Sequence, residues 1–294
     1  MSDLLRKQLR GTGVALVTPF LSDGSIDYTA YKKLIHYVLD NGCQYLVVLG
    51  TTGEAPVLSK DEKIQLINIA YDETKGNVPV VVGIGGNNTA ALIEDLKNFP
   101  LDGAAAVLSA SPYYSKPSQE GIFQHYKALA AVSLKPIMLY NVPGRTGRGI
   151  AAETVIRIAN EVPNVMGIKE ASGDMLHCMQ ILRDKPKDFM VISGDDALAM
   201  AQIACGMEGV ISVAANAFPA HFNKMIDSSL SGDFAAAKKI NDQLLTAYDL
   251  MFCENNPAGI KAFLAEQNII QNYLRLPLVP LSAQVHEMVK RFKL

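Results

Sequence analysis

Residues 165–193, with the sequence VMGIKEASGDMLHCMQILRDKPKDFMVIS, contain one complete unit of the pattern that decides the fold. The apolar run Val165–Lys169 is followed by a loop with Gly173, a helical stretch and a second apolar run, Phe189–Ser193. Neither run alternates apolar with polar residues. A strand of a parallel sheet is buried on both faces, so continuous apolar runs are typical of it. The segment therefore predicts two parallel strands joined by a helix.

The same unit recurs along the whole chain. Eight strand-like runs are present: Val14–Phe20, Tyr45–Leu49, Val78–Val82, Gly103–Leu108, Pro136–Tyr140, Val165–Lys169, Phe189–Ser193 and Gly209–Val213. Eight strand–helix alternations at this spacing predict an α/β protein, a closed (β/α)8 TIM barrel. An open, doubly wound sheet would place G-x-G-x-x-G after its first strand, where this chain has Thr18-Pro-Phe-Leu-Ser-Asp-Gly24. We therefore favour the barrel.

Helix boundaries support this division of the chain. Ser59-Lys-Asp-Glu62 has the form of a capping box, and four residues are candidate N-terminal caps: Asp27, Asn87, Ser118 and Asp195. After Val213 helix follows helix, including 233–249 and 257–267. We expect a catalytic barrel domain over residues 1–228 and a C-terminal helical extension over residues 229–294 that packs on it.

Composition narrows the functional classes. The 294 residues contain 27 Lys+Arg and 29 Asp+Glu, a formal charge of −2, and no run of basic residues, which argues against a nucleic-acid partner. No apolar run approaches the roughly 18 residues of a membrane-spanning helix. The N-terminus lacks the apolar core of a signal peptide, and the four cysteines are scattered singly (Cys43, Cys178, Cys205 and Cys253), which argues against disulfides and zinc. We expect a cytoplasmic protein with no membrane association.

In a TIM barrel the chemistry lies at the C-terminal ends of the strands. The five histidines (36, 125, 177, 221 and 286) all fall in helical stretches instead, so we expect no catalytic metal. Lys169 ends the sixth strand, where it is either a charge that reaches solvent or a Schiff-base nucleophile. Tyr140 ends the adjacent strand and Thr51 the second strand, and both could transfer protons. Arg145 is a candidate carboxylate ligand.

Two further motifs have simple structural interpretations. Gly83-Ile-Gly-Gly86 could bind phosphate, but no Lys or Arg follows it, so a glycine-rich turn is favoured. Asp195 and Asp196 could form an acid–base pair; we favour one as a helix cap and the other as a solvated carboxylate.

Four motifs together carry a family resemblance: Gly50-Thr-Thr-Gly-Glu54, Tyr140-Asn-Val-Pro143, Gly167-Ile-Lys-Glu170 and Ser193-Gly-Asp-Asp196. In order and spacing, from about Gly11 to Leu294, the chain resembles the pyruvate-dependent class I aldolase superfamily. Within it, the doubled Thr51-Thr52 and the Arg145-Thr146 pair are similar to the dihydrodipicolinate synthase family. The sialic-acid lyase branch typically has Ser-Thr in the first motif and lacks that Arg.

The resemblance implies a reaction between pyruvate and L-aspartate 4-semialdehyde on the path to diaminopimelate and lysine. It assigns imine formation to Lys169 and proton transfer to Tyr140, Thr51 and Tyr114, the last from a neighbouring subunit. Its binding residues are Thr51 and Thr52 for the pyruvate carboxylate, Arg145 for the semialdehyde carboxylate, and backbone groups of Gly194 and Ile211. It implies no metal or organic cofactor, and a homotetramer that is a dimer of tight dimers.

One region departs from the family pattern. Lysine-inhibited members have two histidines and a glutamate where this chain has Lys60, Lys63 and Ala91, although Asn87 and Tyr113 match. Two cations would repel the ammonium groups of lysine, and Ala91 cannot pair with one. We therefore expect weak or absent feedback inhibition, unless Glu54 or another carboxylate supplies the missing charge.

Two other functions stay open from the sequence. A 2-keto-3-deoxy sugar-acid aldolase of the same superfamily would share Lys169 and Tyr140, but Arg145 argues against it. A catalytically silent relative, which only binds keto acids or serves as an assembly scaffold, is disfavoured by the complete set of candidate residues.

Overall fold

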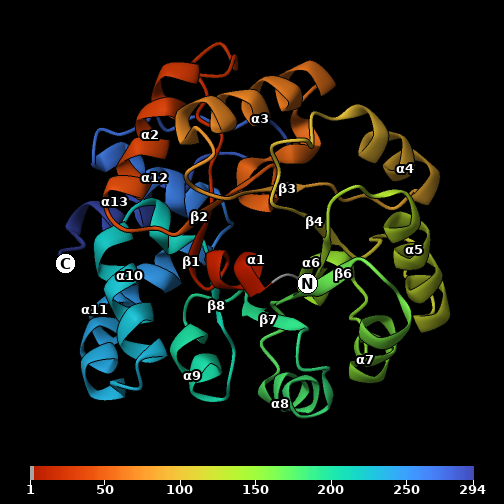
Figure 1. Ribbon diagram of the computed structural model, residues 1–294. Coiled ribbons are helices and arrows are strands. Elements are labelled where there is room, and N and C mark those ends of the chain that lie inside the picture. Colours follow the sequence, from red (N-terminus) through yellow and green to blue (C-terminus); the bar gives the residue numbers. More distant parts are fainter. Residues whose placement is uncertain (1–2) are drawn as a thin grey trace.

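The computed structural model describes residues 3–294 and contains a closed barrel of eight parallel strands in sequence order (Figure 1). The strands are β1 (Gly11–Ala15), β2 (Tyr45–Val48), β3 (Val80–Gly83), β4 (Ala106–Ala110), β5 (Ile137–Asn141), β6 (Val165–Glu170), β7 (Met190–Ser193) and β8 (Gly209–Ser212). The predicted TIM barrel is therefore confirmed.

One helix precedes the first strand, and the helices that follow the strands surround the barrel (Figure 1). They are α1 (Asp3–Gln8), α2 (Tyr28–Asp40), α3 (Lys60–Thr74), α4 (Thr89–Asn98), α5 (Gln119–Val132), α6 (Pro143–Thr146), α7 (Ala152–Glu161), α8 (Met175–Asp184), α9 (Ala199–Ala204), α10 (Pro219–Leu230), α11 (Phe234–Phe252), α12 (Ala258–Glu266) and α13 (Ala283–Arg291). Three short 3-10 helices are η1 (Thr51–Gly53), η2 (Ala55–Val57) and η3 (Ala214–Asn216). In the part of the chain described, no helix is long and apolar enough to cross a membrane.

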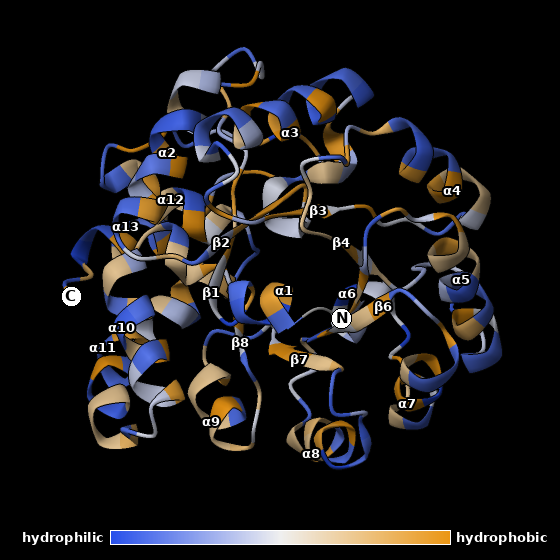
Figure 2. Ribbon diagram, viewed as in Figure 1, coloured by the Kyte–Doolittle hydropathy of each residue, from blue (hydrophilic) through white to orange (hydrophobic). Residues whose placement is uncertain are grey.

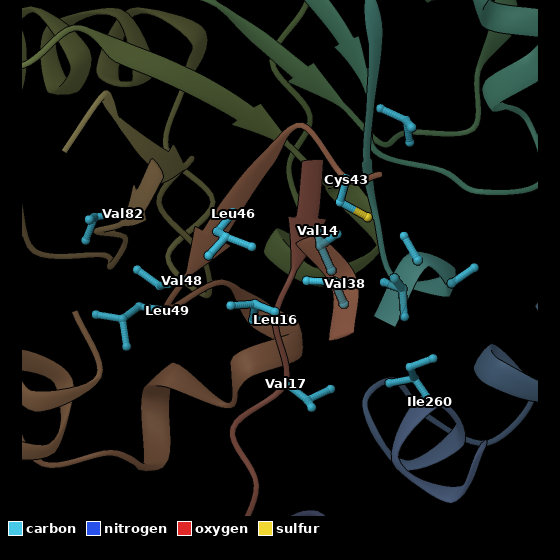
Figure 3. Close-up of a cluster of buried hydrophobic side chains, with 14 of the residues drawn as sticks. Val14, Leu16, Val17, Val38, Cys43, Leu46, Val48, Leu49, Val82 and Ile260 are labelled. Atoms are coloured by element: carbon cyan, nitrogen blue, oxygen red, sulfur yellow. The ribbon is translucent and has the colours of Figure 1, made fainter. Parts of the chain in front are cut away.

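Alternate residues of each strand belong to two separate cores. Tyr45 and Val47 of β2 lie in an inner core inside the barrel, whereas Leu46 and Val48 lie in an outer core between strands and helices. Figure 3 shows part of the outer core, in which Val14 of β1 lies beside Val38 of α2. Figure 2 shows that the surrounding helices carry both hydrophobic and hydrophilic residues. Because both faces are buried, the strands read as continuous apolar runs.

The first strand differs from its predicted bounds. It covers Gly11–Ala15 rather than Val14–Phe20, and Phe20 makes only an isolated antiparallel bridge with Ile26. The segment after β1 is nonetheless buried, with Phe20 0% exposed, so the apolar pattern continues beyond the ladder. The start of β1 cannot be recognised in the sequence because Gly11 and Gly13 are weak strand formers. Glycine is required at Gly11 because its φ is +103°, and at its ladder partner Gly209 because a Cβ there would lie 2.2 Å from the Gly11 carbonyl oxygen.

Most predicted helix starts are confirmed. Ser59 and Glu62 form the capping box of α3, and Asp27 and Ser118 cap α2 and α5. Two predictions were wrong. Asn88, not Asn87, caps α4, and the side chain of Asp195 accepts hydrogen bonds from the turn before α9 rather than from the helix itself.

The two ends of the chain cover different parts of the barrel. In Figure 1 the helix α1 lies over the middle of the ring, and Arg6 holds it there through two hydrogen bonds to Glu208 at 2.5 and 3.0 Å. At the other terminus, α11 packs along α10, and α12 contacts α11, α13 and η3. Helix α10 ends at Leu230, so the division at residue 228 into barrel and extension stays a prediction.

Candidate active site

Lys169 and Tyr140 form the centre of the candidate site. They are direct ladder partners on β6 and β5, and both point into the inner core side of the barrel mouth. The Nζ atom of Lys169 lies 4.3 Å from the centroid of the Tyr140 ring. Lys169 is 5% exposed and Tyr140 8%. The interpretation of Lys169 as a charge reaching solvent is therefore wrong: the amine is buried against a phenol.

A cavity of about 510 Å³ opens beside this pair. It is lined by Thr51, Tyr140 and Arg145, together with backbone and side chains of the loops after β2, β3 and β4. Lys169 does not itself line the cavity; its amine lies against the ring of Tyr140, which does. The volume is in the range of small-molecule sites in enzymes.

Gly194 lies next to Lys169. The resemblance assigns backbone groups of Gly194 and Ile211 to the pocket, and neither residue is among those that line the cavity described above, so this assignment stays a prediction. A Cβ at Gly194 would lie 2.8 Å from Cε of Lys169, so the glycine leaves the space in which the lysine chain lies. The Gly194 amide donates a 2.7 Å hydrogen bond to the Glu170 carbonyl oxygen. Ile211, 1% exposed, belongs to the inner core with Tyr140.

Thr51 and Thr52 lie on η1, directly after β2. Thr18 fixes this turn by donating a 2.6 Å hydrogen bond from its hydroxyl to the Gly53 carbonyl oxygen. Thr51 is half-buried and lines the cavity. Thr52 is buried, and its hydroxyl oxygen accepts a 3.1 Å hydrogen bond from the Asn256 side-chain amide. The two threonines therefore differ: Thr51 lines the cavity, and Thr52 is bound by Asn256 in the segment between α11 and α12.

Arg145 stands at the edge of the cavity on the short helix α6. Its side chain is exposed, and one Nη donates a 3.3 Å hydrogen bond to the Asn256 carbonyl oxygen. Pro143 begins α6 and Gly147, in the left-handed conformation, ends it. The arrangement leaves a guanidinium facing the site entrance, where a carboxylate can bind it.

The residues that follow Tyr140 and Lys169 form a buried polar group behind them. Asn141 and Glu170 are also ladder partners, and Asn141 donates a 2.8 Å hydrogen bond to the Glu170 carboxylate. His177 on α8 lies 3.3 Å from the same carboxylate. The hydrogen bond with Glu170 raises the pKa of His177 above its usual value. The Asn141 Oδ1 also accepts from the Ile150 amide, which anchors the loop that carries Arg145.

Tyr114 does not reach the cavity of its own chain. It is 86% exposed and has a positive φ of 70°, whereas its neighbour Tyr113, 41% exposed, lines the cavity. A positive φ is uncommon in a residue other than glycine. Within one chain, therefore, the structure brings together Lys169, Tyr140, Thr51 and Arg145 but leaves Tyr114 outside.

Of the three positions that depart from the lysine-inhibited pattern, Lys63 lines the same cavity, as does Tyr113, which matches the pattern. Lys60 and Ala91 are not among the lining residues; Lys60 is exposed, with its amine 5.8 Å from the Phe99 ring centroid. Asp95, four residues after Ala91 on α4, also lines it. Sequence reasoning did not single out this carboxylate. The other candidate, Glu54, is buried in an ion pair with Lys261 at 2.5 Å.

The two aspartates after β7 are both structural. Asp195 accepts from the amides of Ala197 and Leu198. Asp196 is buried rather than solvated, which corrects the expectation, and it accepts from the amides of Val213 and Ala214 at 3.1 and 2.7 Å. Burial raises the pKa of Asp196 to about 6. Asp196 therefore ties the segment after β8 to the segment after β7.

Three residues near the site had no signal in the sequence: Asn256, Lys261 and Asp95. Asn256 is 204 positions from the threonine it binds, and no local pattern predicts such a contact. Over residues 3–294, no group of three or more His, Cys, Asp and Glu side chains is arranged to hold a metal ion.

Comparisons with known proteins show which family the chain resembles. The sequence profile of the dihydrodipicolinate synthetase family matches residues 8–292. The 4-hydroxy-tetrahydrodipicolinate synthase of Parabacteroides distasonis is 48% identical over 282 residues, 96% of this chain and 95% of the relative. The crystal structure of dihydrodipicolinate synthase from Thermotoga maritima covers 96% of this chain and 97% of its own, with TM-score 0.94 and 39% identity. That of the Acinetobacter baumannii enzyme, described as complexed with pyruvate, has TM-score 0.93 and 38% identity over 96% and 97% of the two chains.

Proposed function

The chain belongs to the dihydrodipicolinate synthetase family, and we propose that Lys169 is the residue through which it acts. The activity is that of a 4-hydroxy-tetrahydrodipicolinate synthase, the name of its relatives. The enzyme condenses pyruvate with L-aspartate 4-semialdehyde in lysine and diaminopimelate biosynthesis. It is a class I aldolase-type reaction that proceeds through a lysine Schiff base. Neither the sugar-acid aldolase nor the silent relative is favoured.

The buried contact between Lys169 and Tyr140 is the observation that supports this proposal. The amine of Lys169 attacks C2 of pyruvate, and loss of water gives the imine. The imine withdraws electrons, so that C3 loses a proton and becomes an enamine that attacks the aldehyde carbon. In our proposal Tyr140, whose ring centroid lies 4.3 Å from the amine, gives and takes the protons of these steps. No organic cofactor takes part in this scheme.

The carboxylates of the two substrates require separate ligands. Thr51 lines the cavity near Tyr140, and the amides and hydroxyls of Thr51 and Thr52 hold the pyruvate carboxylate in our proposal. Arg145, exposed at the edge, binds the carboxylate of the semialdehyde. Backbone groups of Gly194 and Ile211 line the space around the imine. A cation at the entrance also attracts an anionic substrate.

Tyr114 completes the site only in an oligomer. Its ring is 86% exposed and outside its own cavity, and we propose that it enters the site of a second copy, where it extends the proton relay from Tyr140 through Thr51. The assembly we expect is a homotetramer, a dimer of tight dimers, and its location is the cytoplasm.

A coupled assay tests the substrate assignment. The purified protein is given pyruvate with either L-aspartate 4-semialdehyde or a sugar-derived aldehyde, and product formation is followed in each case. We expect turnover with the semialdehyde at least about 100-fold above that with a polyol aldehyde, because only the former offers a carboxylate to Arg145. Equal or greater turnover with the polyol aldehyde would favour the sugar-acid aldolase instead.

A further inference from the structure

Glu54, the last residue of the Gly50-Thr-Thr-Gly-Glu54 motif, is buried and bound from the opposite end of the chain. Its side chain and that of Lys261 on α12 are both 0% exposed, and the carboxylate and amine lie 2.5 Å apart. Glu54 has a positive φ of 55° where η1 ends and η2 begins. A non-glycine residue in this conformation is strained and needs support from its surroundings.

Further contacts from the C-terminal segment hold the same loop. The Lys261 amine donates a 2.9 Å hydrogen bond to the Tyr273 carbonyl oxygen, and the Arg275 amide donates one of 3.2 Å to Glu54. The Arg275 guanidinium binds both carboxylate oxygens of Glu62, at the start of α3, at 2.5 and 2.8 Å. The segment from η1 to α3 is therefore attached to the C-terminal segment at two charged points.

Asn256, which precedes α12 by two residues, connects this attachment to the substrate ligands. Its side-chain amide donates to the Thr52 hydroxyl, and its carbonyl oxygen accepts from Arg145. Asn256 is 5% exposed, so water does not readily replace either partner. The position of α12 therefore affects both of the residues to which we assign carboxylate binding, Thr52 after β2 and Arg145 after β5.

A buried ion pair is a poor means of stabilising a fold, because the desolvation of both charges offsets their attraction. Apolar residues of similar size would hold α12 against the barrel as well. An ion pair is more directional than apolar packing, because its two charged groups interact well in one relative arrangement only. Burial lowers the pKa of Lys261, which the Glu54 carboxylate opposes, and this is the balance expected of a fully desolvated pair.

We propose that Glu54 and Lys261 are positioning residues: their ion pair holds α12 and the Thr51–Glu54 turn in the one arrangement that binds the substrate carboxylates. The inference rests on the proposed roles of Thr51, Thr52 and Arg145. It gives the C-terminal helices a part in the reaction although none of their residues touches the reacting atoms.

The test compares single and paired replacements. Glu54→Gln and Lys261→Met each leave one buried group without its partner, and the double variant removes both charges. Arg6→Met is the matched control, because it leaves Glu208 without its partner at α1, remote in the fold from the loops that line the cavity. For each protein, KM for both substrates, kcat, the melting temperature and imine trapping at saturating pyruvate are measured.

We expect KM for both substrates to rise about 10- to 100-fold in the Glu54 and Lys261 variants, because small displacements of the residues that bind substrate have effects of this size. Imine trapping should stay complete at saturating pyruvate. The double variant should regain melting temperature but not KM, which separates positioning from stability. Normal KM in the folded double variant would overturn the proposal, and so would an equal rise in KM in Arg6→Met at equal loss of melting temperature. If the unchanged protein trapped no pyruvate, the function itself would be refuted instead.

Asn256→Ala provides an independent test. It removes the side-chain bond to Thr52 but keeps the backbone carbonyl that Arg145 binds, so KM for pyruvate should rise about 10-fold while KM for the semialdehyde stays within about 2-fold. Unchanged KM for pyruvate, or an equal rise in both constants, would contradict the link through Asn256.

Discussion

The Lys169 amine lies 4.3 Å from the Tyr140 ring centroid because the two residues are direct ladder partners of β6 and β5. Side chains of paired residues in a parallel ladder point the same way, so a lysine and a tyrosine in register meet on one side of the sheet. Their successors, Glu170 and Asn141, are paired too and meet on the other side, behind the site. Backbone pairing therefore makes the side chains of Lys169 and Tyr140 neighbours.

Lys169 should be the only residue that forms the imine. Borohydride reduction in the presence of pyruvate should add one reduced pyruvyl group to the peptide that contains it, as mapped by mass spectrometry. Lys169→Ala and Lys169→Arg should show neither label nor turnover, since a guanidinium stays protonated and cannot attack a carbonyl. Label on another peptide, or undiminished turnover in Lys169→Ala, would contradict the mechanism.

Loss of a proton-relay hydroxyl should lower kcat more than it changes KM. We expect about 10- to 1,000-fold lower kcat in Tyr140→Phe, Thr51→Val and Tyr114→Phe, the usual contribution of general acid–base groups. Steady-state kinetics measures this. Tyr113→Phe is a control for Tyr114→Phe, since the neighbouring ring lines the cavity of its own chain. Analytical ultracentrifugation under assay conditions must find at least a dimer; a fully active monomer would refute the role of Tyr114.

Arg145→Ala should affect one substrate only. Without the guanidinium, KM for the semialdehyde should rise about 10- to 100-fold, because one charge-assisted pair is lost. Imine trapping with pyruvate should stay near that of the unchanged protein. Arg148→Ala, a replacement of an exposed arginine on the same loop, is the control and should change neither quantity. Loss of trapping with unchanged semialdehyde KM would reverse the assignment.

L-Lysine should inhibit weakly or not at all. Loss of one desolvated charge partner typically costs 2–5 kcal/mol, or about 30- to 4,000-fold in affinity, and Lys63 in the cavity lining adds repulsion. Turnover measured across a lysine titration tests this prediction. We expect the lysine concentration at half-inhibition to lie above about 1 mM. Half-inhibition below that value would contradict the prediction. Asp95→Asn would then show whether the Asp95 carboxylate, which lines the same cavity, supplies the charge.

His177 should make stability depend on pH. The Glu170 hydrogen bond raises its pKa above the ordinary 6.5, so protonated His177 stabilises the fold. This contribution is complete below pH 6.5 and is lost as the pH rises through the raised pKa. His177→Gln should therefore lower the free energy of unfolding by about 1–3 kcal/mol more at pH 5.5 than at pH 9, in the range of one hydrogen bond to a charged group.

Denaturant unfolding at the two pH values measures this difference. His36→Gln is the control: that side chain is 55% exposed beside Glu73, and its effect should be smaller at either pH. A His177→Gln effect that is equal at both values, or larger at pH 9, would show that the pair does not act through the protonated imidazole.

The sequence predicts what local pattern and strand order determine. Because β5 and β6 are consecutive and each strand end is recognisable, the meeting of Lys169 with Tyr140 could be expected. Contacts between distant segments could not: neither Asn256 with Thr52 nor Lys261 with Glu54 leaves a trace in local periodicity. The bounds of β1 failed for the same reason, since the apolar run past Ala15 is buried by segments elsewhere in the chain rather than by a longer strand.

Gly194 constrains how a chain of this kind can diverge. Any side chain there would begin 2.8 Å from Cε of Lys169 and 2.7 Å from Cβ of Ala171, so even alanine competes with the nucleophile for space. Substitutions of Gly194 are therefore selected against as long as the Lys169 amine is needed. Evolution toward a different aldehyde must therefore proceed through the exposed rim, where Arg145 can be exchanged without disturbing the lysine.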